Sequence, residues 1–249
     1  MLKIYELILY PWLTLAVIIF FILLKINAPY GKFFNKDFGL SLNYKLGWFI
    51  QEIVSPLTFS FFFFYGPIQK NIITWIFFSI WILHYIYRSI VFPLRMNKNN
   101  SKIPIAIILS AILFNSINGF TNGFYFSNIN YYEPTYYVNI NFLIGSIFLL
   151  TGIYINITAD NILIKLKLKN EGYIIPHGKL YKYISCPNYF GEMLEWLGFA
   201  IMTFSLPAFI FFLWTVANLF PRAIATHKWY KKTFENYPNK RKAIIPFII

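Results

Sequence analysis

The chain has 249 residues, of which 58% are hydrophobic, 22% aromatic and only 12% charged, with a formal net charge of +13. Soluble domains carry roughly a quarter charged residues, so this composition excludes an ordinary soluble protein and indicates an integral membrane protein. The cations lie in loops between apolar segments and in the C-terminal tail, which is typical of cytoplasmic loops and not of a nucleic-acid-binding surface. We therefore expect membrane lipids, and no nucleic acid, as partners.

Apolar stretches of spanning length predict an all-α fold with seven transmembrane helices. The first stretch lacks the basic start and the small-residue cleavage site of a signal peptide, so we interpret it as a retained helix. A break between the last two spans is predicted at Ser205-Leu206-Pro207, because proline disfavours helix at the preceding residue. The spans fall roughly at 4–26, 46–65, 71–93, 103–126, 139–164, 188–204 and 206–224, and we expect residues 1–249 to form a single membrane domain.

The loop charges predict the orientation in the membrane. Lysine and arginine concentrate after the first, third, fifth and seventh spans, whereas the other connections hold Lys70, Glu133 and no charge around Ser205. The positive-inside rule then places the N-terminus outside and the C-terminus in the cytoplasm. We expect a monomer, in either a bacterial inner membrane or the endoplasmic reticulum.

Cysteine and histidine give no sign of a metal site. The only cysteine, Cys186, excludes an internal disulfide framework and a cysteine-based metal cluster. The histidines at 84, 177 and 227 are too scattered in the sequence to suggest joint ligation of a metal. We expect no metal.

Two early spans contain polar residues that could carry chemistry. Gln51 and Glu52 follow Trp48 inside the second span, where a carboxyl group must find a partner or take up a proton. A hydrogen bond that joins two helices is the alternative. In the third span Tyr85 and Arg88 are three residues apart and share a helix face; the tyrosine could donate to a ligand oxygen or serve as an interfacial anchor.

The end of the fifth span places an amide, a carboxylate and a cation on one stripe. Asn156, Asp160 and Lys167 are spaced by four and seven residues along a continuing helix. Such a set suits a ribose or phosphate ligand, although Lys167 alone could be a solvated lysine of a cytoplasmic loop.

The sixth span carries a second polar stripe, formed by Asn188, Glu192 and Glu195. Pro187 before it fits a helix start, where free backbone N–H groups favour anions. The chain has no GxGxxG or phosphate-binding loop, so any nucleotide is not held in the Rossmann manner. Further polar candidates follow near and beyond the seventh span, at Arg222, His227, Tyr230 and Arg241, among which arginine can recognise phosphate through a planar fork of donors.

These residues lie in runs that resemble the steroid 5-alpha-reductase family. The specific runs are SCPNYFGEMLEWLGFA at 185–200, NLFPRA-x-x-x-H-x-WY at 218–230 and FENYPNKRKAIIPFI at 234–248. Weaker matches are APYGK at 28–32, WFIQE at 48–52, LHYIYR at 83–88, NGF-x-NGFY at 118–125 and INI-x-x-D at 155–160. The resemblance covers nearly the whole chain and is strongest from Asn156 on; we take the protein for a bacterial homologue.

The resemblance implies a seven-helix membrane enzyme that uses NADPH to reduce the Δ4 double bond of a 3-oxo-Δ4 steroid, or of a steroid-like lipid enone, to the 5α-dihydro product. Residues 1–126 would then form mainly the substrate pocket and residues 139–249 mainly the NADPH-binding half. Glu52 and Tyr85 match the pair that hydrogen-bonds the 3-oxo group, and Trp48 and Gln51 match the substrate pocket. Cofactor positions are matched by Tyr30, Lys32, Asn156, Asp160, Lys167, Tyr173, Asn188, Glu192, Arg222, Tyr230 and Arg241.

Departures from the family pattern leave alternatives open. Lys167 stands where an arginine is familiar, which keeps the charge but loses the bidentate fork. Ser110 and Thr226 stand where animal enzymes often carry arginine and histidine. The alternatives are a related membrane reductase of a polyprenol or an enoyl thioester, and an isoprenylcysteine methyltransferase that uses S-adenosylmethionine. A small transporter or binding protein is a further alternative from a different class, although the sequence shows no inverted repeat.

Overall fold

The structure is a computed structural model that describes residues 1–249 except 28, 30, 34–38, 97–100 and 170–171. Its described part is mostly helical, which confirms the predicted class, but two short strands that the sequence did not predict pair antiparallel: β1 (Ser41–Asn43) and β2 (Lys102–Pro104). The α-helices are α1 (Leu2–Lys25), α2 (Tyr44–Tyr65), α3 (Ile72–Ile86), α4 (Phe92–Arg95), α5 (Ile105–Phe124), α6 (Ile140–Lys169), α7 (Pro187–Thr203) and α8 (Leu206–Thr233).

Within the described residues, six helical stretches are long and apolar enough to cross a membrane. The expected span at 188–204 corresponds to α7, which has 17 residues and therefore a length of about 25 Å, less than the roughly 30 Å of a bilayer core. The seven expected spans are therefore not all long enough to cross a membrane. The six helical stretches of spanning length are Leu2–Lys25, Tyr44–Tyr65, Ile72–Arg95, Ile105–Ile129, Ile140–Lys169 and Leu206–Thr233.

The chain forms two compact units. Unit 1 comprises residues 1–10 and 28–139, and unit 2 comprises residues 11–27 and 140–249. In unit 1, α2 packs against α3 and α5. The contact with α5 is close because Gly119 and Gly123 face the backbone of α2, and a Cβ atom at Gly123 would lie 2.5 Å from the carbonyl oxygen of Phe59. Small residues four apart are a common means of close packing between membrane helices.

The third span contains a π-helical turn, Tyr87–Val91, between α3 and α4. The N–H of Phe92 donates to the carbonyl of Tyr87, five residues back. Pro93 has no N–H to donate to the carbonyl of Ser89. The wider π-helical turn lets the helix continue past this missing hydrogen bond. Such turns are frequent at functional sites, and this one begins two residues after Tyr85.

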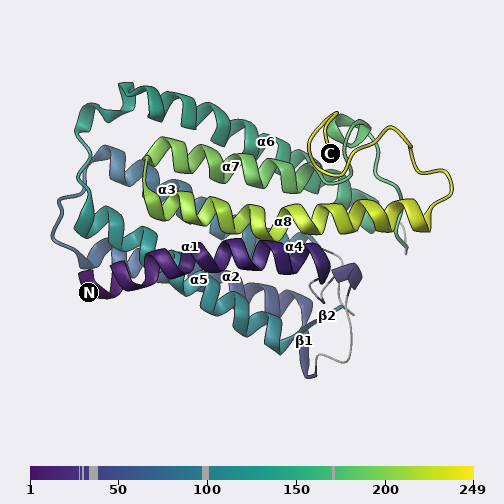
Figure 1. Cartoon of the computed structure of the whole chain (residues 1–249), viewed down its shortest axis with the longest axis horizontal. Coiled ribbons are helices and arrows are strands. Elements are labelled where there is room, and N and C mark those ends of the chain that lie inside the picture. The colour runs from purple at the N-terminus through teal and green to yellow at the C-terminus, as the bar shows by residue number, and fades with distance from the viewer. Residues whose placement is uncertain (28, 30, 34–38, 97–100, 170–171) are drawn as a thin grey trace. The chain divides into compact units, whose positions relative to one another are not determined.

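In unit 2, α6, α7 and α8 lie side by side (Figure 1). Glycines permit the tightest of these contacts: Gly145 and Gly152 on α6 face α7, and Gly191 and Gly198 on α7 face α6. A Cβ atom at Gly191 would lie 2.5 Å from the backbone nitrogen of Asn156. The two backbones therefore approach so closely that polar side chains on both helices can bond across the contact.

The break between α7 and α8 is confirmed. Phe204 adopts the left-handed conformation, with φ of 45°, and α8 begins at Leu206. This helix runs past the predicted end at residue 224 to Thr233. Thr226 and Tyr230 are buried in the added turns, so side-chain packing continues along α8 beyond the point where hydropathy falls.

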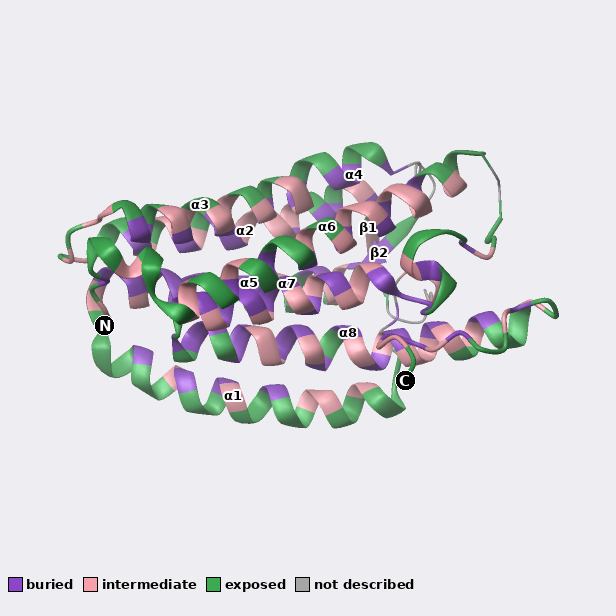
Figure 2. Cartoon of the chain, turned by 90° about the horizontal axis from the view of Figure 1, so that it is seen from above, coloured by how far each residue is buried: buried purple, intermediate pink, exposed green. Residues whose placement is uncertain are grey.

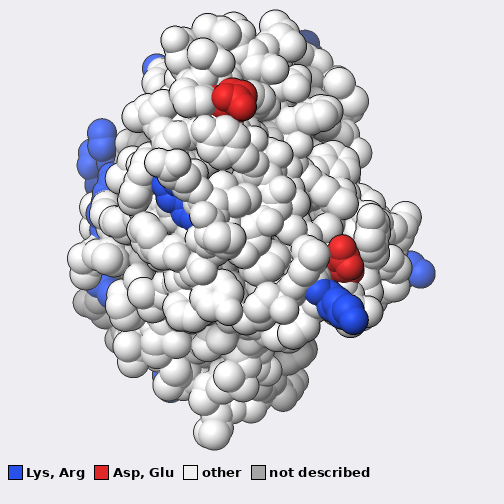
Figure 3. Space-filling model, turned by 90° about the vertical axis from the view of Figure 1, so that its left-hand side faces the viewer, with Lys and Arg blue, Asp and Glu red and all other residues white. Residues whose placement is uncertain are grey.

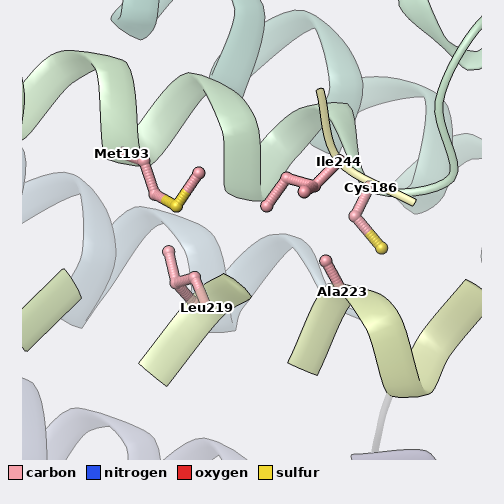
Figure 4. Close-up of a cluster of buried hydrophobic side chains, with 5 residues drawn as sticks. All are labelled: Cys186, Met193, Leu219, Ala223 and Ile244. Carbon is pink, nitrogen blue, oxygen red and sulfur yellow. The ribbon is translucent and has the colours of Figure 1, made fainter. Parts of the chain in front are cut away.

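The C-terminal segment, residues 234–249, folds back on the start of α7. Lys242 N–H donates to Tyr183 O (2.8 Å) and Ser185 N–H donates to Lys242 O (2.9 Å). Five buried side chains pack beneath this contact and join α7, α8 and the C-terminal segment: Cys186, Met193, Leu219, Ala223 and Ile244 (Figure 4).

Many large apolar side chains are exposed on the surface. Along α1 only one stripe is buried and most other residues are exposed (Figure 2), including the apolar Leu7 and Phe21, which are 73% and 60% exposed. Large exposed apolar surfaces mark membrane or protein contacts. The side of the molecule shown in Figure 3 carries few charged residues.

Candidate active site

A hydrogen-bond network in unit 1 links the two residues predicted to polarise a carbonyl group. The Tyr85 hydroxyl donates to Asn115 Oδ1 (3.4 Å), and Asn115 Nδ2 donates to the backbone carbonyl of Gln51 (2.6 Å). Gln51 Nε2 donates to Glu52 Oε1 (3.3 Å). Tyr85, Asn115 and Gln51 are buried and Glu52 is half-buried, so bulk water is kept from the bonds that Asn115 makes.

The backbone of α2 is also altered at this point. Pro56 lies inside the helix and has no N–H, so the carbonyl of Glu52, four residues earlier, loses its usual helical partner. The predicted catalytic carboxyl group therefore sits on the turn of α2 where the regular hydrogen-bond ladder is interrupted.

Trp48 lies one turn before Gln51 and makes contacts with the third span. Its indole N–H donates to Arg88 O (2.9 Å). The Arg88 guanidinium stacks on Trp48 at 5.1 Å and on Phe92 at 4.9 Å, distances at which a cation is attracted to the face of a ring. Trp48 and the Tyr85 helix are thereby tied together, while Arg88 stacks on rings beside the network.

The two polar stripes predicted in unit 2 face each other across the glycine contact of α6 and α7. Asn156 Nδ2 donates to Asn188 O (3.0 Å) and to Glu192 Oε2 (3.4 Å), and Asn188 Nδ2 donates to Asp160 Oδ1 (3.1 Å). The four side chains form one cluster of two amides and two carboxylates. Glu195, expected on the same face of α7, is buried where its backbone meets Gly152.

Three further predicted residues, Lys167, Tyr173 and Arg222, lie close to one another, with Tyr173 between the two cations. Lys167 Nζ lies 5.7 Å from the ring centroid of Tyr173, which packs edge-on against Trp229 at 5.0 Å. Arg222 Nε donates to the Tyr189 hydroxyl (3.1 Å). Partial burial raises the pKa of Tyr173, and the nearby Arg222 charge acts in the opposite direction.

The last two predicted residues meet through Tyr237. Tyr230 stacks on Tyr237 with ring centroids 5.4 Å apart, and the Arg241 guanidinium lies 5.1 Å from the centroid of Tyr237. Arg241 is only 3% exposed, and its Nε and Nη1 atoms have no hydrogen-bond partner within the described residues. A buried arginine with unfilled donors is suited to a bound anion.

Two predicted cofactor residues are not among the described residues of unit 2. Tyr30 lies outside the described residues, and Lys32 belongs to unit 1, where its Nζ lies 5.9 Å from the ring of Phe33. Conversely, the prediction missed Asn115, which stands with Asn118 and Asn122 at spacings of three and seven in an otherwise apolar span. This polar stripe could have identified Asn115 as a candidate site residue from the sequence.

These features define a helical multi-pass membrane protein whose polar and ionisable side chains gather inside its helical units, the arrangement expected of functional groups at membrane depth. Residues 101–249 match the family described as 3-oxo-5-alpha-steroid 4-dehydrogenase. The chain is 41% identical to steroid 5-alpha-reductase DET2 of Arabidopsis thaliana, over 91% of this chain and 90% of that protein. It is 34% identical to 3-oxo-5-alpha-steroid 4-dehydrogenase 1 of Rattus norvegicus, over 90% of this chain and 88% of that protein.

The chain belongs to the 3-oxo-5-alpha-steroid 4-dehydrogenase family. It is accordingly an oxidoreductase of the steroid 5-alpha-reductase type, a class that acts on CH–CH groups.

Proposed function

We propose that this protein reduces the Δ4 double bond of a 3-oxo-Δ4 steroid to the 5α-dihydro steroid, with NADPH as the reductant. The names of the relatives support the substrate class. The observation that carries the proposal is the hydrogen-bond network that connects the buried Tyr85, Asn115 and Gln51 to the half-buried Glu52. It offers hydrogen-bonding groups to a carbonyl oxygen inside an apolar span, where a steroid can dissolve.

The residues of unit 2 fit a dinucleotide. Amide and carboxylate groups such as those of Asn156, Asp160 and Asn188 suit ribose hydroxyls, which both donate and accept. The unfilled donors of the buried Arg241 suit a phosphate group, and Arg222 and Lys167 supply further positive charge near Tyr173. When bound, NADPH supplies the hydride. We propose that these residues hold it, together with Tyr30, Lys32, Tyr173, Glu192 and Tyr230.

The chain's own contribution to chemistry follows from where charge develops. As the β-carbon C5 of the enone accepts a hydride, electrons move onto the 3-oxo oxygen, and C4 then gains a proton. Donors that meet this oxygen in a site without bulk water stabilise the transition state more than the ground state. We assign these donors to the Tyr85 hydroxyl and to Glu52 in its protonated form, with Trp48 and Gln51 lining the steroid pocket.

The test uses purified protein in lipid nanodiscs with NADPH and a 3-oxo-Δ4 steroid, following NADPH consumption and identifying the product. We expect the 5α-dihydro steroid. Glu52→Leu, which leaves no donor at this position, and Tyr85→Phe should each lower kcat by about 10²- to 10³-fold, the usual loss for one donor to a developing oxyanion. Tyr65→Phe is a matched control, because Tyr65 is exposed on the same helix as Glu52. Full activity of both variants would remove these residues from the mechanism.

We further propose an N-terminus outside and a C-terminus in the cytoplasm of the host membrane, a bacterial inner membrane or the endoplasmic reticulum, and a monomeric enzyme. The single cysteine, Cys186, is buried, so cysteines introduced at the exposed Lys3 and Lys240 can be labelled selectively. An impermeant thiol reagent applied from outside should label position 3 and not position 240. The reverse pattern would invert the topology.

A further inference from the structure

Ser185 lies where α7, α8 and the C-terminal segment meet, and it has no role in the proposed reaction. It lies between the helical turn 179–182 and α7, and it is 3% exposed. Its Oγ atom lies 2.6 Å from His227 Nδ1 on α8, 2.5 Å from the Tyr237 hydroxyl and 3.0 Å from the carbonyl oxygen of Lys242. One buried hydroxyl thus contacts both α8 and two points of the C-terminal segment.

The three contacts fix the direction of every hydrogen bond. A serine hydroxyl has one proton and can accept two hydrogen bonds. The carbonyl of Lys242 can only accept, so it takes the serine proton. His227 Nδ1–H and the Tyr237 O–H must then both donate to Ser185 Oγ. This arrangement accounts for all three contacts of Ser185 Oγ and requires a proton on His227 Nδ1.

Tyr237, whose position is fixed by its bond to Ser185, is in turn a neighbour of Arg241. With its own proton committed to Ser185, the Tyr237 oxygen is left as an acceptor, and its ring lies under the Arg241 guanidinium at 5.1 Å. The backbone on both sides is held as well: Ser185 N–H donates to Lys242 O, and Cys186 N–H donates to Ala243 O (3.2 Å). Arg241 is therefore flanked by groups that are anchored to Ser185.

We propose that Ser185 is a positioning residue for the cofactor. It holds Tyr237 and the backbone at Lys242 so that the buried Arg241 guanidinium keeps its unfilled donors directed at an anionic group of NADPH. This inference rests on the proposed function, in which Arg241 contacts the cofactor. Ser185 itself does not touch the reacting atoms.

The experiment measures NADPH affinity without turnover, from the fluorescence of NADPH titrated with purified full-length protein in nanodiscs. Ser185→Ala should raise the Kd about tenfold, which corresponds to about 1.4 kcal/mol. The kcat at saturating NADPH and the KM for the steroid should stay within twofold. Tyr237→Phe, which keeps the ring and loses only the hydroxyl, should reproduce the effect if Ser185→Ala folds poorly. Ser146→Ala is the control, because that hydroxyl bonds to Phe142 O and Met202 Sδ and to none of the groups that Ser185 contacts.

A double-variant series separates positioning from general destabilisation. In an Arg241→Gln background, Ser185→Ala should change the NADPH Kd by less than twofold, because the group it positions is gone. An unchanged Kd in both Ser185→Ala and Tyr237→Phe, or an equal rise with and without Arg241, would overturn the inference alone. A normal Kd in Arg241→Gln itself would instead overturn the cofactor role of Arg241 and the positioning role with it.

Discussion

The Tyr85 hydroxyl, on α3, lies 3.4 Å from Oδ1 of Asn115, on α5. The amide of Asn115 cannot turn over without losing its 2.6 Å bond to the Gln51 carbonyl, so it presents an acceptor, and not a donor, to the tyrosine. The long bond to Asn115 is weak by ordinary geometric standards. A steroid oxygen that gains negative charge is a stronger acceptor than an amide, so the hydroxyl can turn from Asn115 to the substrate as the reaction proceeds.

This relationship predicts that Asn115 acts through Tyr85. Asn115→Leu should lower kcat for steroid reduction about five- to tenfold, because the hydroxyl is no longer held in one place. In a Tyr85→Phe background the same substitution should change kcat by less than twofold. The double-mutant cycle on purified enzyme measures this coupling, which lies at about 0.5–3 kcal/mol for residues in one network. An equal loss in both backgrounds would show that Asn115 only joins the helices.

Helical spacing was enough to predict each polar stripe but not how the stripes meet. Asn156 with Asp160, and Asn188 with Glu192, were each placed on one helix face from their spacing of four. Which faces oppose depends on the packing of α6 on α7, and this packing depends on glycines whose role is visible only in three dimensions. Bonds to backbone carbonyls, such as those at Gln51 and Asn188, also leave no trace in the residue types.

The ends of elements were harder to predict than their existence. The final span was expected to stop near residue 224 because hydropathy falls there, but buried positions at Thr226 and Tyr230 carry α8 on to Thr233. Ser185 and Tyr237 were missed as partners because they are 52 residues apart. Only the return of the C-terminal segment to the start of α7 brings them together.

The glycine contact between α6 and α7 predicts a strong effect of one added methyl group. In Gly191→Ala the new Cβ atom would lie 2.5 Å from the backbone nitrogen of Asn156, so the helices must separate. Overpacking of this kind costs about 1–3 kcal/mol of unfolding free energy, and NADPH affinity should fall because the polar cluster spans the same contact. Gly172→Ala, where nothing lies within 4 Å, is the control. Thermal unfolding in nanodiscs gives the stabilities, and equal midpoints for the two variants would contradict the prediction.

The hydrogen bond between Asp160 and Asn188 predicts that exchanging the two side chains restores NADPH affinity. Asn188→Asp places a second carboxylate 3.1 Å from Asp160 Oδ1, and Asp160→Asn leaves Asn188 only a neutral amide oxygen as its acceptor. Each single variant should weaken NADPH binding about tenfold, the size expected for loss of one charge-assisted hydrogen bond. The double variant Asp160→Asn/Asn188→Asp restores one amide and one carboxylate and should recover most of the affinity in a fluorescence titration. A double variant as weak as the worse single one would mean that the carboxylate must stay on α6.

Tyr181 predicts how stability changes at alkaline pH. It is 1% exposed, its hydroxyl donates to Ala159 O (3.4 Å), and burial, with the charge of Asp160 in addition, raises its pKa well above the ordinary value. Below about pH 10 the tyrosine is protonated in both states. Above that pH the unfolded chain loses the proton and the folded chain does not, so stability falls as pH rises.

Tyr181→Phe should flatten this fall by up to about 1.4 kcal/mol per pH unit, at a cost of about 1 kcal/mol near neutral pH for the lost hydrogen bond. Denaturant unfolding at pH 8, 10 and 11 measures the slopes, and Tyr65→Phe, at an exposed site, should keep the wild-type slope. A Tyr181→Phe slope equal to that of the wild type would show that the hydroxyl ionises as readily in the folded protein as in the unfolded chain.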